Sequence, residues 1–195
     1  SRAIDSKGVA KYVLNGSPGK DIVKLELVSA AAKGGFIVNG NAGDDEFYMG
    51  GDVQKLDDVL AGKITFDGGA GSDLLFIDDR KAAVGKNYTF TKSDLTRAGG
   101  VVVEYQSFAE VSFKVGAGPM GAKLEVEKKS TAEGTKYFVE HAGGARILLG
   151  NANNLLDDIR GPITVTSLDG TGNIELFDSG FAGGGSYVFA GNTVT

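Results

Sequence analysis

Three glycine-rich loops carry aspartates whose oxygens are suited to holding a cation. The loops cover residues 16–24 (GSPGKDIVK), 40–48 (GNAGDDEFY) and 68–76 (GGAGSDLLF). Calcium takes six to eight oxygen ligands at flexible angles, including carboxylates and backbone carbonyls. The oxygens of these loops are therefore of the kind that calcium prefers.

The same aspartates have a second interpretation as turn residues. Asp in a tight turn accepts hydrogen bonds from backbone N–H groups nearby, and it does this without any ion. Both interpretations remain open from the sequence.

Other polar residues give weaker signals. Asp78 and Asp79 are adjacent, and neighbours on a strand point to opposite faces, so they are poor partners for acid–base catalysis. His141 is the only histidine and has no evident Asp or Ser partner. We therefore expect no catalytic residues and no enzymatic activity. Two sequons make Asn15 and Asn87 candidate glycosylation sites if the chain is secreted by a eukaryote.

The third loop resembles the RTX nonapeptide of secreted bacterial proteins, Gly-Gly-x-Gly-x-Asp-x-apolar-x, at every position. In that family the pattern forms a parallel β-roll with calcium between stacked turns. The resemblance implies a calcium site here, for which the candidate ligands are the side chains of Asp21, Asp44, Asp45 and Asp73 and the backbone carbonyls of Gly40, Gly43, Gly69 and Gly71. Here the loops begin at Gly16, Gly40 and Gly68, much further apart than the units of a nonapeptide repeat. This spacing favours the longer coils of an ordinary parallel β-helix. The layout is also similar to long bacterial surface proteins, which implies an extracellular or cell-surface location.

The chain also repeats itself. A shift of 99 residues places Gly62 on Gly161, Ile64 on Ile163 and Asp79 on Asp178. Such self-similarity indicates an array of stacked units. We predict two units, residues 1–118 and 119–195, the first with an incomplete N-terminal part and the second truncated. The second is expected to be completed by the N-terminus of the next copy, in a tandem array or a head-to-tail polymer.

The loop carboxylates are not kept in the second unit. Under the same shift Asp21 corresponds to Met120 and Asp73 to Gly172, and a shift of 110 places Leu155 on Asp45. The stacked scaffold is therefore the shared requirement, and any ion site belongs to the first unit.

Short β-type runs alternate with Gly, Asn and Asp turns along the whole chain. Several runs alternate apolar and polar residues with period two, as in Val23, Leu25 and Leu27, which places one side of each strand in a core. Residues 53–60 predict one short helical turn. We expect an all-β fold, a right-handed parallel β-helix of two tandem units. Tandem β-sandwiches are the alternative, although the buried Trp of many such domains is missing.

Composition excludes some functions. The net charge is −5 and the pI near 4.9, which argues against nucleic-acid binding because that requires a basic face. No apolar run approaches the roughly 20 residues that span a bilayer. There is no cysteine, and Gly is abundant, with 31 residues against three prolines, as expected for ordered structure rich in turns.

These observations predict a structural role. The expected function is an extracellular module or filament protomer that stacks head to tail through β-strand ladders, with itself as the main partner. One alternative is a calcium-dependent adhesion or carbohydrate-binding module that contacts surface glycans. A third is a polysaccharide-active β-helix enzyme.

Overall fold

A computed structural model of the chain describes residues 10–25, 35–51, 56, 63–82, 86–97, 101–115, 123–126, 134–141, 144–150, 156, 159–178, 189–190 and 193–194. For residues 101–102, 123–126, 189–190 and 193–194 the description covers the backbone only.

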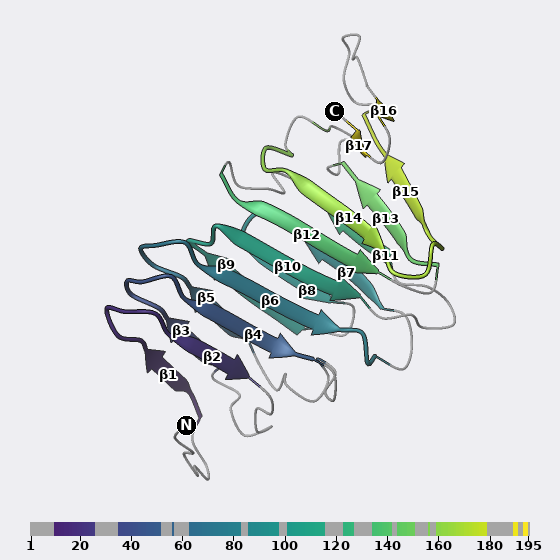
Figure 1. Cartoon of the computed structure of the whole chain (residues 1–195). Helices are drawn as coiled ribbons and strands as arrows, with labels where there is room; N and C mark the ends of the chain where they lie inside the picture. The colour runs from purple at the N-terminus through teal and green to yellow at the C-terminus, as the bar shows by residue number, and fades with distance from the viewer. Residues whose placement is uncertain are drawn as a thin grey trace.

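The described chain is all-β with almost no helix, and it forms a parallel β-solenoid (Figure 1). A nine-stranded sheet, called sheet A here, has the order β1-β3-β5-β9-β8-β7-β11-β13-β15. A six-stranded sheet B has the order β14-β12-β10-β6-β4-β2, and β16 and β17 form a separate pair. The strands of sheet A are β1 (Tyr12–Asn15), β3 (Phe36–Asn39), β5 (Ile64–Asp67), β7 (Asn87–Phe90), β8 (Asp94–Arg97), β9 (Val101–Gln106), β11 (Lys123–Val126), β13 (Arg146–Leu149) and β15 (Asn173–Leu176). Those of sheet B are β2 (Ile22–Leu25), β4 (Glu46–Gly50), β6 (Leu74–Asp79), β10 (Glu110–Val115), β12 (Lys136–His141) and β14 (Ile163–Ser167), and the separate pair is β16 (Phe189–Ala190) and β17 (Thr193–Val194).

The register of the strands gives the length of each coil. In the first coil, Tyr12 pairs with Phe36 in sheet A and Ile22 with Glu46 in sheet B. The next coil is longer, because Phe36 pairs with Ile64. These pairings are parallel, and they have the same spacing as the glycine-rich loops, as the sequence predicted. The solenoid is therefore confirmed, and the alternative of tandem β-sandwiches, whose sheets are antiparallel, is wrong.

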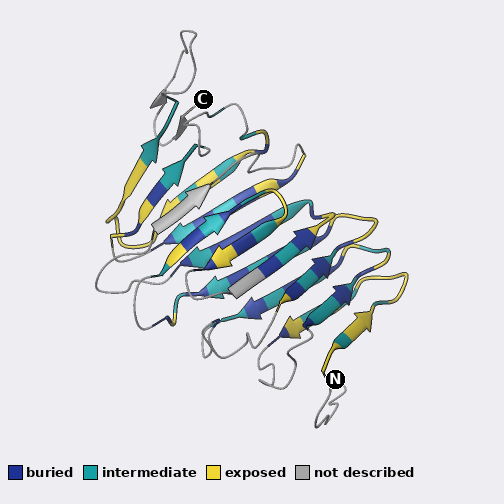
Figure 2. Cartoon of the chain, turned by 180° about the vertical axis from the view of Figure 1, so that it is seen from behind, coloured by how far each residue is buried: buried dark blue, intermediate teal, exposed yellow. Residues whose placement is uncertain are grey.

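The core lies between the two sheets and is built from rows of in-register side chains. Phe47, Leu75 and Val111 form one such row on β4, β6 and β10, and all three are buried. Their outward neighbours are less buried, as the alternating colours of the strands show (Figure 2). Period-two alternation in the sequence thus gives the two faces of each strand.

One segment departs from a simple solenoid. β8 is antiparallel to both β7 and β9, so residues 87–106 form a meander within sheet A. The first turn of the meander is held by Thr91, whose side-chain oxygen accepts the N–H of Asp94 at 3.0 Å. As a result two additional strands separate β9 from β11 in sheet A, whereas β10 and β12 are direct neighbours in sheet B.

The repeat in the sequence relates strands of opposite sheets. It places β5 of sheet A on β14 of sheet B, and β6 of sheet B on β15 of sheet A. A local detail recurs nonetheless: Asp79 Oδ1 accepts the N–H of Leu56 at 2.9 Å, and Asp178 Oδ1 accepts the N–H of Leu156 at 3.1 Å. The repeat therefore copies local structure on opposite faces of the stack. The division into units at residue 118 stays a prediction, since residues 116–122 lie outside the described part.

Most predicted strands are present. The predicted helical turn at 53–60 is described only at Leu56, which is helical and fully buried. No helix among the described residues has the length and hydropathy needed to cross a membrane.

Candidate functional site

The three acidic loops are brought together as a stack of turns. Residues 16–21, 40–45 and 68–73 each connect a strand of sheet A to the following strand of sheet B. The backbone N–H of Asp45 donates to Asp73 Oδ1 at 2.8 Å, and the N–H of Asp21 donates to Asp45 Oδ1 at 2.8 Å. Asp73 and Asp45 thus each accept the N–H of the corresponding aspartate in the preceding coil, which forms a ladder along the solenoid.

The remaining predicted acidic ligands also serve as acceptors. Asp21 Oδ2 accepts the N–H of Ser17 at 2.6 Å within its own turn. Asp44 Oδ1 accepts the N–H of Ser72 at 2.8 Å from the next coil. These bonds are the kind that the turn interpretation of the aspartates predicts.

The glycines let the turns approach closely. A Cβ on Gly71 would lie well inside 3.0 Å of the Gly43 carbonyl oxygen, and one on Gly16 would meet the carbonyl oxygen of Gly40. The carbonyl of Gly40 therefore lies against Gly16, and the carbonyl of Gly43 lies against Gly71. Gly69 and Gly71 have φ values of 94° and 141°, which side chains rarely adopt, and this explains why Gly occupies these positions.

Three oxygens of the stack have no partner among the described residues. Asp45 and Asp73 are fully buried, and the Oδ2 atom of each lacks a hydrogen bond, as does Oδ1 of Asp67. Within the described ranges, however, no three acidic or histidine side chains lie together as a metal site requires. Calcium binding therefore stays a prediction.

The surroundings of Asp73 raise its pKa. Burial is the largest cause, the hydrogen bond from the Asp45 backbone opposes it, and the charges of Asp45, Asp44 and Asp67 raise the pKa further. The folded state thus binds a proton on Asp73 more readily than the unfolded state does. The stability that follows from this is fully present below the ordinary carboxyl pKa of 3.8 and is lost as the pH rises through the raised pKa of the folded state.

We accordingly expect a pH-dependent difference between the wild type and Asp73→Asn. Asparagine keeps an acceptor for the Asp45 N–H and removes the titrating group. As the pH falls from about 7 to about 4, the free energy of unfolding of the wild type should increase relative to that of the variant. Urea denaturation of both proteins across this range measures the difference. A difference that stays constant or has the opposite slope contradicts a raised pKa at Asp73.

The aspartate ladder ends at the fourth turn. β9 and β10 are joined by only three residues, 107–109, and the Asp73 carbonyl there accepts the N–H groups of Ala109 and Glu110 at 3.0 and 3.2 Å. In the second unit, Gly172 lies in the turn before β15, where a Cβ would overlap the ring of His141. Met120 and Leu155 lie outside the described residues. The acidic row is thus restricted to the first three coils of the described chain.

Both predicted glycosylation sites are exposed. Asn15 ends β1, and its Oδ1 accepts a hydrogen bond from Asn39 Nδ2 at 2.7 Å. Asn87 is the first residue of β7. The structure does not test glycosylation, which remains a prediction for both residues.

A buried ion pair is a feature that sequence reasoning missed. Asp79 Oδ2 accepts hydrogen bonds from Arg97 Nη1 at 2.7 Å and from the Tyr88 hydroxyl at 2.6 Å. The side chains of Asp79 and Arg97 are 0% and 4% exposed. Asp79 is therefore not a solvated residue, because it is buried and paired, and its Oδ1 also accepts the N–H of Leu56. The pair joins the meander of sheet A to β6 of sheet B.

The two ends of the solenoid form a second candidate site. β1 and β2 are edge strands at one end, and β15 and β14 are edge strands at the other (Figure 1). Among the described residues, all the large hydrophobic side chains that are exposed lie in these end coils: Val13 (55%), Leu14 (40%), Ile22 (59%), Leu168 (52%) and Ile174 (51%). Unpaired edges with exposed apolar side chains are templates for pairing with another chain.

Comparison with protein-family models gives no match, and comparisons with curated proteins and with solved structures give none either. Function is therefore inferred from the residues and their geometry.

Proposed function

We propose that the chain is a structural module that stacks head to tail with further copies of itself, at the cell surface or outside the cell. The observation that carries this proposal is the concentration of exposed apolar side chains in the two end coils, most of them on strands that pair on one side only within the described part of the chain. A second copy that is stacked on one end along the solenoid axis would place a parallel strand beside each of the two edge strands at that end.

The charges of the two ends are complementary. Residues 10–25, at the first end, contain three lysines and one aspartate, a net charge of +2. Residues 159–178, at the other end, contain one arginine, one glutamate and two aspartates, a net charge of −2. Opposite charges at the two ends favour contact between unlike ends over contact between like ends. Contact between unlike ends is heterologous, and it gives an open filament if the rotation does not close a ring.

Ile22→Glu tests this proposal. It places a carboxylate on the edge strand β2, where it would face the acidic end of the next copy. We expect the wild type to form oligomers or fibres whose mass increases with concentration, and the variant to sediment as a single 20.1 kDa chain. Sedimentation velocity over a concentration series, followed by electron microscopy, measures this.

Leu74→Glu is the matched control. Leu74 lies in the same register row as Ile22, but on the interior strand β6. Circular dichroism first establishes that the variant is folded. A folded Leu74→Glu variant should assemble as the wild type does. A wild-type protein that remains a single 20.1 kDa species at every concentration would overturn the proposal.

Calcium binding by the stacked turns is a second candidate function. The buried oxygens without partners, Asp45 Oδ2, Asp73 Oδ2 and Asp67 Oδ1, favour it, because a buried carboxylate oxygen without a partner is costly. The comparison of wild type and Asp73→Asn tests this candidate when it is repeated with millimolar calcium. Bound calcium should raise the melting temperature of the wild type only. Equal melting temperatures with and without calcium contradict a calcium site.

A further inference from the structure

The outer face of sheet B carries a hollow that none of the preceding sites uses. It lies over β4, β6 and β10 and has a volume of about 290 Å³. Its lining includes Tyr48, Phe76, Gly50, Asp78 and Lys114. Ligand pockets usually measure about 300–1,000 Å³, so this hollow is suited to one small ring.

One wall of the hollow is aromatic. Tyr48 and Phe76 are in register on β4 and β6, and their rings stack with centroids 4.8 Å apart and planes 8° from parallel. The other face of Tyr48 is occupied by Lys24, whose Nζ lies 5.5 Å from the ring centroid. The next residue of the row after Phe76 is Ser112, which has no ring. No ring of this row therefore stacks on the face of Phe76 toward β10.

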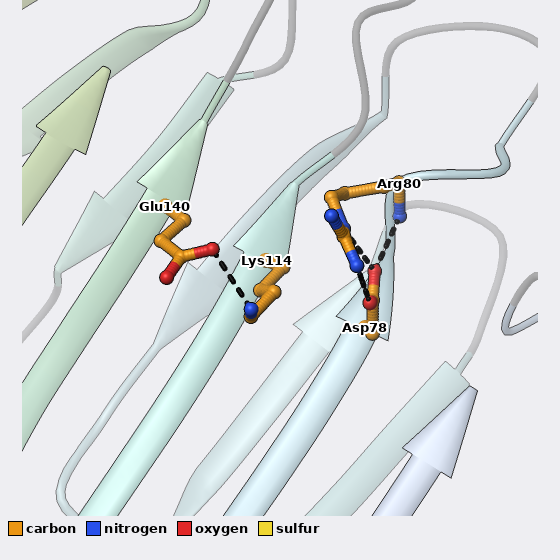
Figure 3. A network of polar contacts seen from close by, with 4 residues as sticks. All are labelled: Asp78, Arg80, Lys114 and Glu140. Carbon is orange, nitrogen blue, oxygen red and sulfur yellow. Dashed lines mark hydrogen bonds and ion pairs between the residues drawn. The ribbon is translucent and has the colours of Figure 1, made fainter. Parts of the chain in front are cut away.

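The other wall is polar and held in place by ion pairs (Figure 3). Arg80 donates to Asp78 through Nε at 3.0 Å and through Nη2 at 2.6 Å, and Lys114 Nζ lies 2.9 Å from Glu140 Oε2. Both oxygens of Asp78 are occupied by Arg80, whose backbone N–H also donates to Asp78 Oδ1 at 3.0 Å. Lys114 retains donors, since an ammonium has three N–H groups.

From this geometry we infer that the hollow is a binding subsite for one neutral pyranose unit of a glycan. A pyranose has an apolar C–H face, which suits the face of Phe76 that has no stacked ring, and hydroxyls that accept hydrogen bonds, which suits Lys114. The charges of the two acidic and two basic side chains of the polar wall sum to zero, so the hollow does not select a charged ligand. This subsite is independent of the stacking proposed above.

The test titrates the full chain with glucose, galactose and mannose and with their disaccharides, using saturation-transfer NMR and calorimetry. For a ligand of this size we expect a dissociation constant on the order of 1 mM. Phe76→Ala should weaken binding at least tenfold because it removes the stacking face. Lys114→Met should weaken it severalfold because it removes the donor while keeping most of the side-chain volume. If Phe76→Ala does not fold, Lys114→Met still tests the inference.

Phe138→Ala is the matched control. Phe138 occupies the same register row on β12, beyond Ser112, and is not part of the lining of the hollow. Its substitution should leave the dissociation constant unchanged. The inference is overturned if no neutral sugar binds at a concentration about 50-fold above the expected dissociation constant. It is also overturned if Phe76→Ala and Lys114→Met are both folded and bind the sugar as tightly as the wild type does.

Discussion

Replacing Arg97 with methionine is expected to lower the free energy of unfolding by about 3–5 kcal/mol. Methionine has a similar shape but no charge, so the substitution leaves the fully buried Asp79 carboxylate without its cation. The cost arises from the uncompensated charge and is larger than the net contribution of the intact pair. Urea denaturation of the two proteins at pH 7 measures the difference.

Two comparisons separate the buried charge from other effects. Arg80→Met breaks the neighbouring pair with Asp78, which is partly exposed, and should cost no more than about 1 kcal/mol. The double variant Asp79→Asn/Arg97→Met removes both charges and keeps an acceptor for the Leu56 N–H. It should be more stable than Arg97→Met alone. If Arg97→Met costs no more than Arg80→Met, the pair does not anchor the meander.

The second large effect is expected at the stacked turns, from Gly71→Ala. The new methyl group would overlap the Gly43 carbonyl oxygen, which is backbone and has little freedom to move. The residue also has a φ of 141°, which alanine rarely adopts. Overpacking of this kind typically costs about 1–3 kcal/mol in addition to the strain of the backbone.

Gly51→Ala isolates the backbone contribution. Gly51 has nearly the same φ, 142°, and a Cβ there would have no atom within 4 Å. It should therefore be less destabilising than Gly71→Ala by about 1–3 kcal/mol, the part that is due to overlap. Thermal and urea denaturation of both variants give this difference. Equal losses would mean that the turns do not pack as closely as the structure shows.

The strands that were predicted correctly have a local signal. β2, β4 and β6 show period-two alternation and are bounded by Gly and Asp, and the loop spacing also predicted the length of the coils. Of the strands that were missed, β1 and β8 have a physical reason. β8 reads Asp-Leu-Thr-Arg, with one large apolar residue, and it is tolerated in the core because Arg97 pairs with Asp79. β1 is an edge strand whose apolar residues do not alternate in burial.

The candidate sites depend more on long-range packing. The four predicted acidic ligands were found from the sequence because their loops share a pattern, and three of them, Asp21, Asp45 and Asp73, form one ladder in the structure. The sequence did not show that their hydrogen-bond donors lie in the neighbouring coil, nor did it show the hollow beside Phe76 or the exposed apolar ends. The sequence also did not show that the repeat relates strands of sheet A to strands of sheet B.

Alternation, turn residues and loop spacing are properties of neighbouring residues, so the chain alone specifies a stack of short strands joined by glycine–aspartate turns. Which side chains meet depends on the register between coils, which joins residues far apart in the sequence, and on the meander that shifts sheet A against sheet B. A one-residue change of register moves every side chain to the other face. The burial of Asp79 and the position of Ser112 beside Phe76 are therefore consequences of packing between coils.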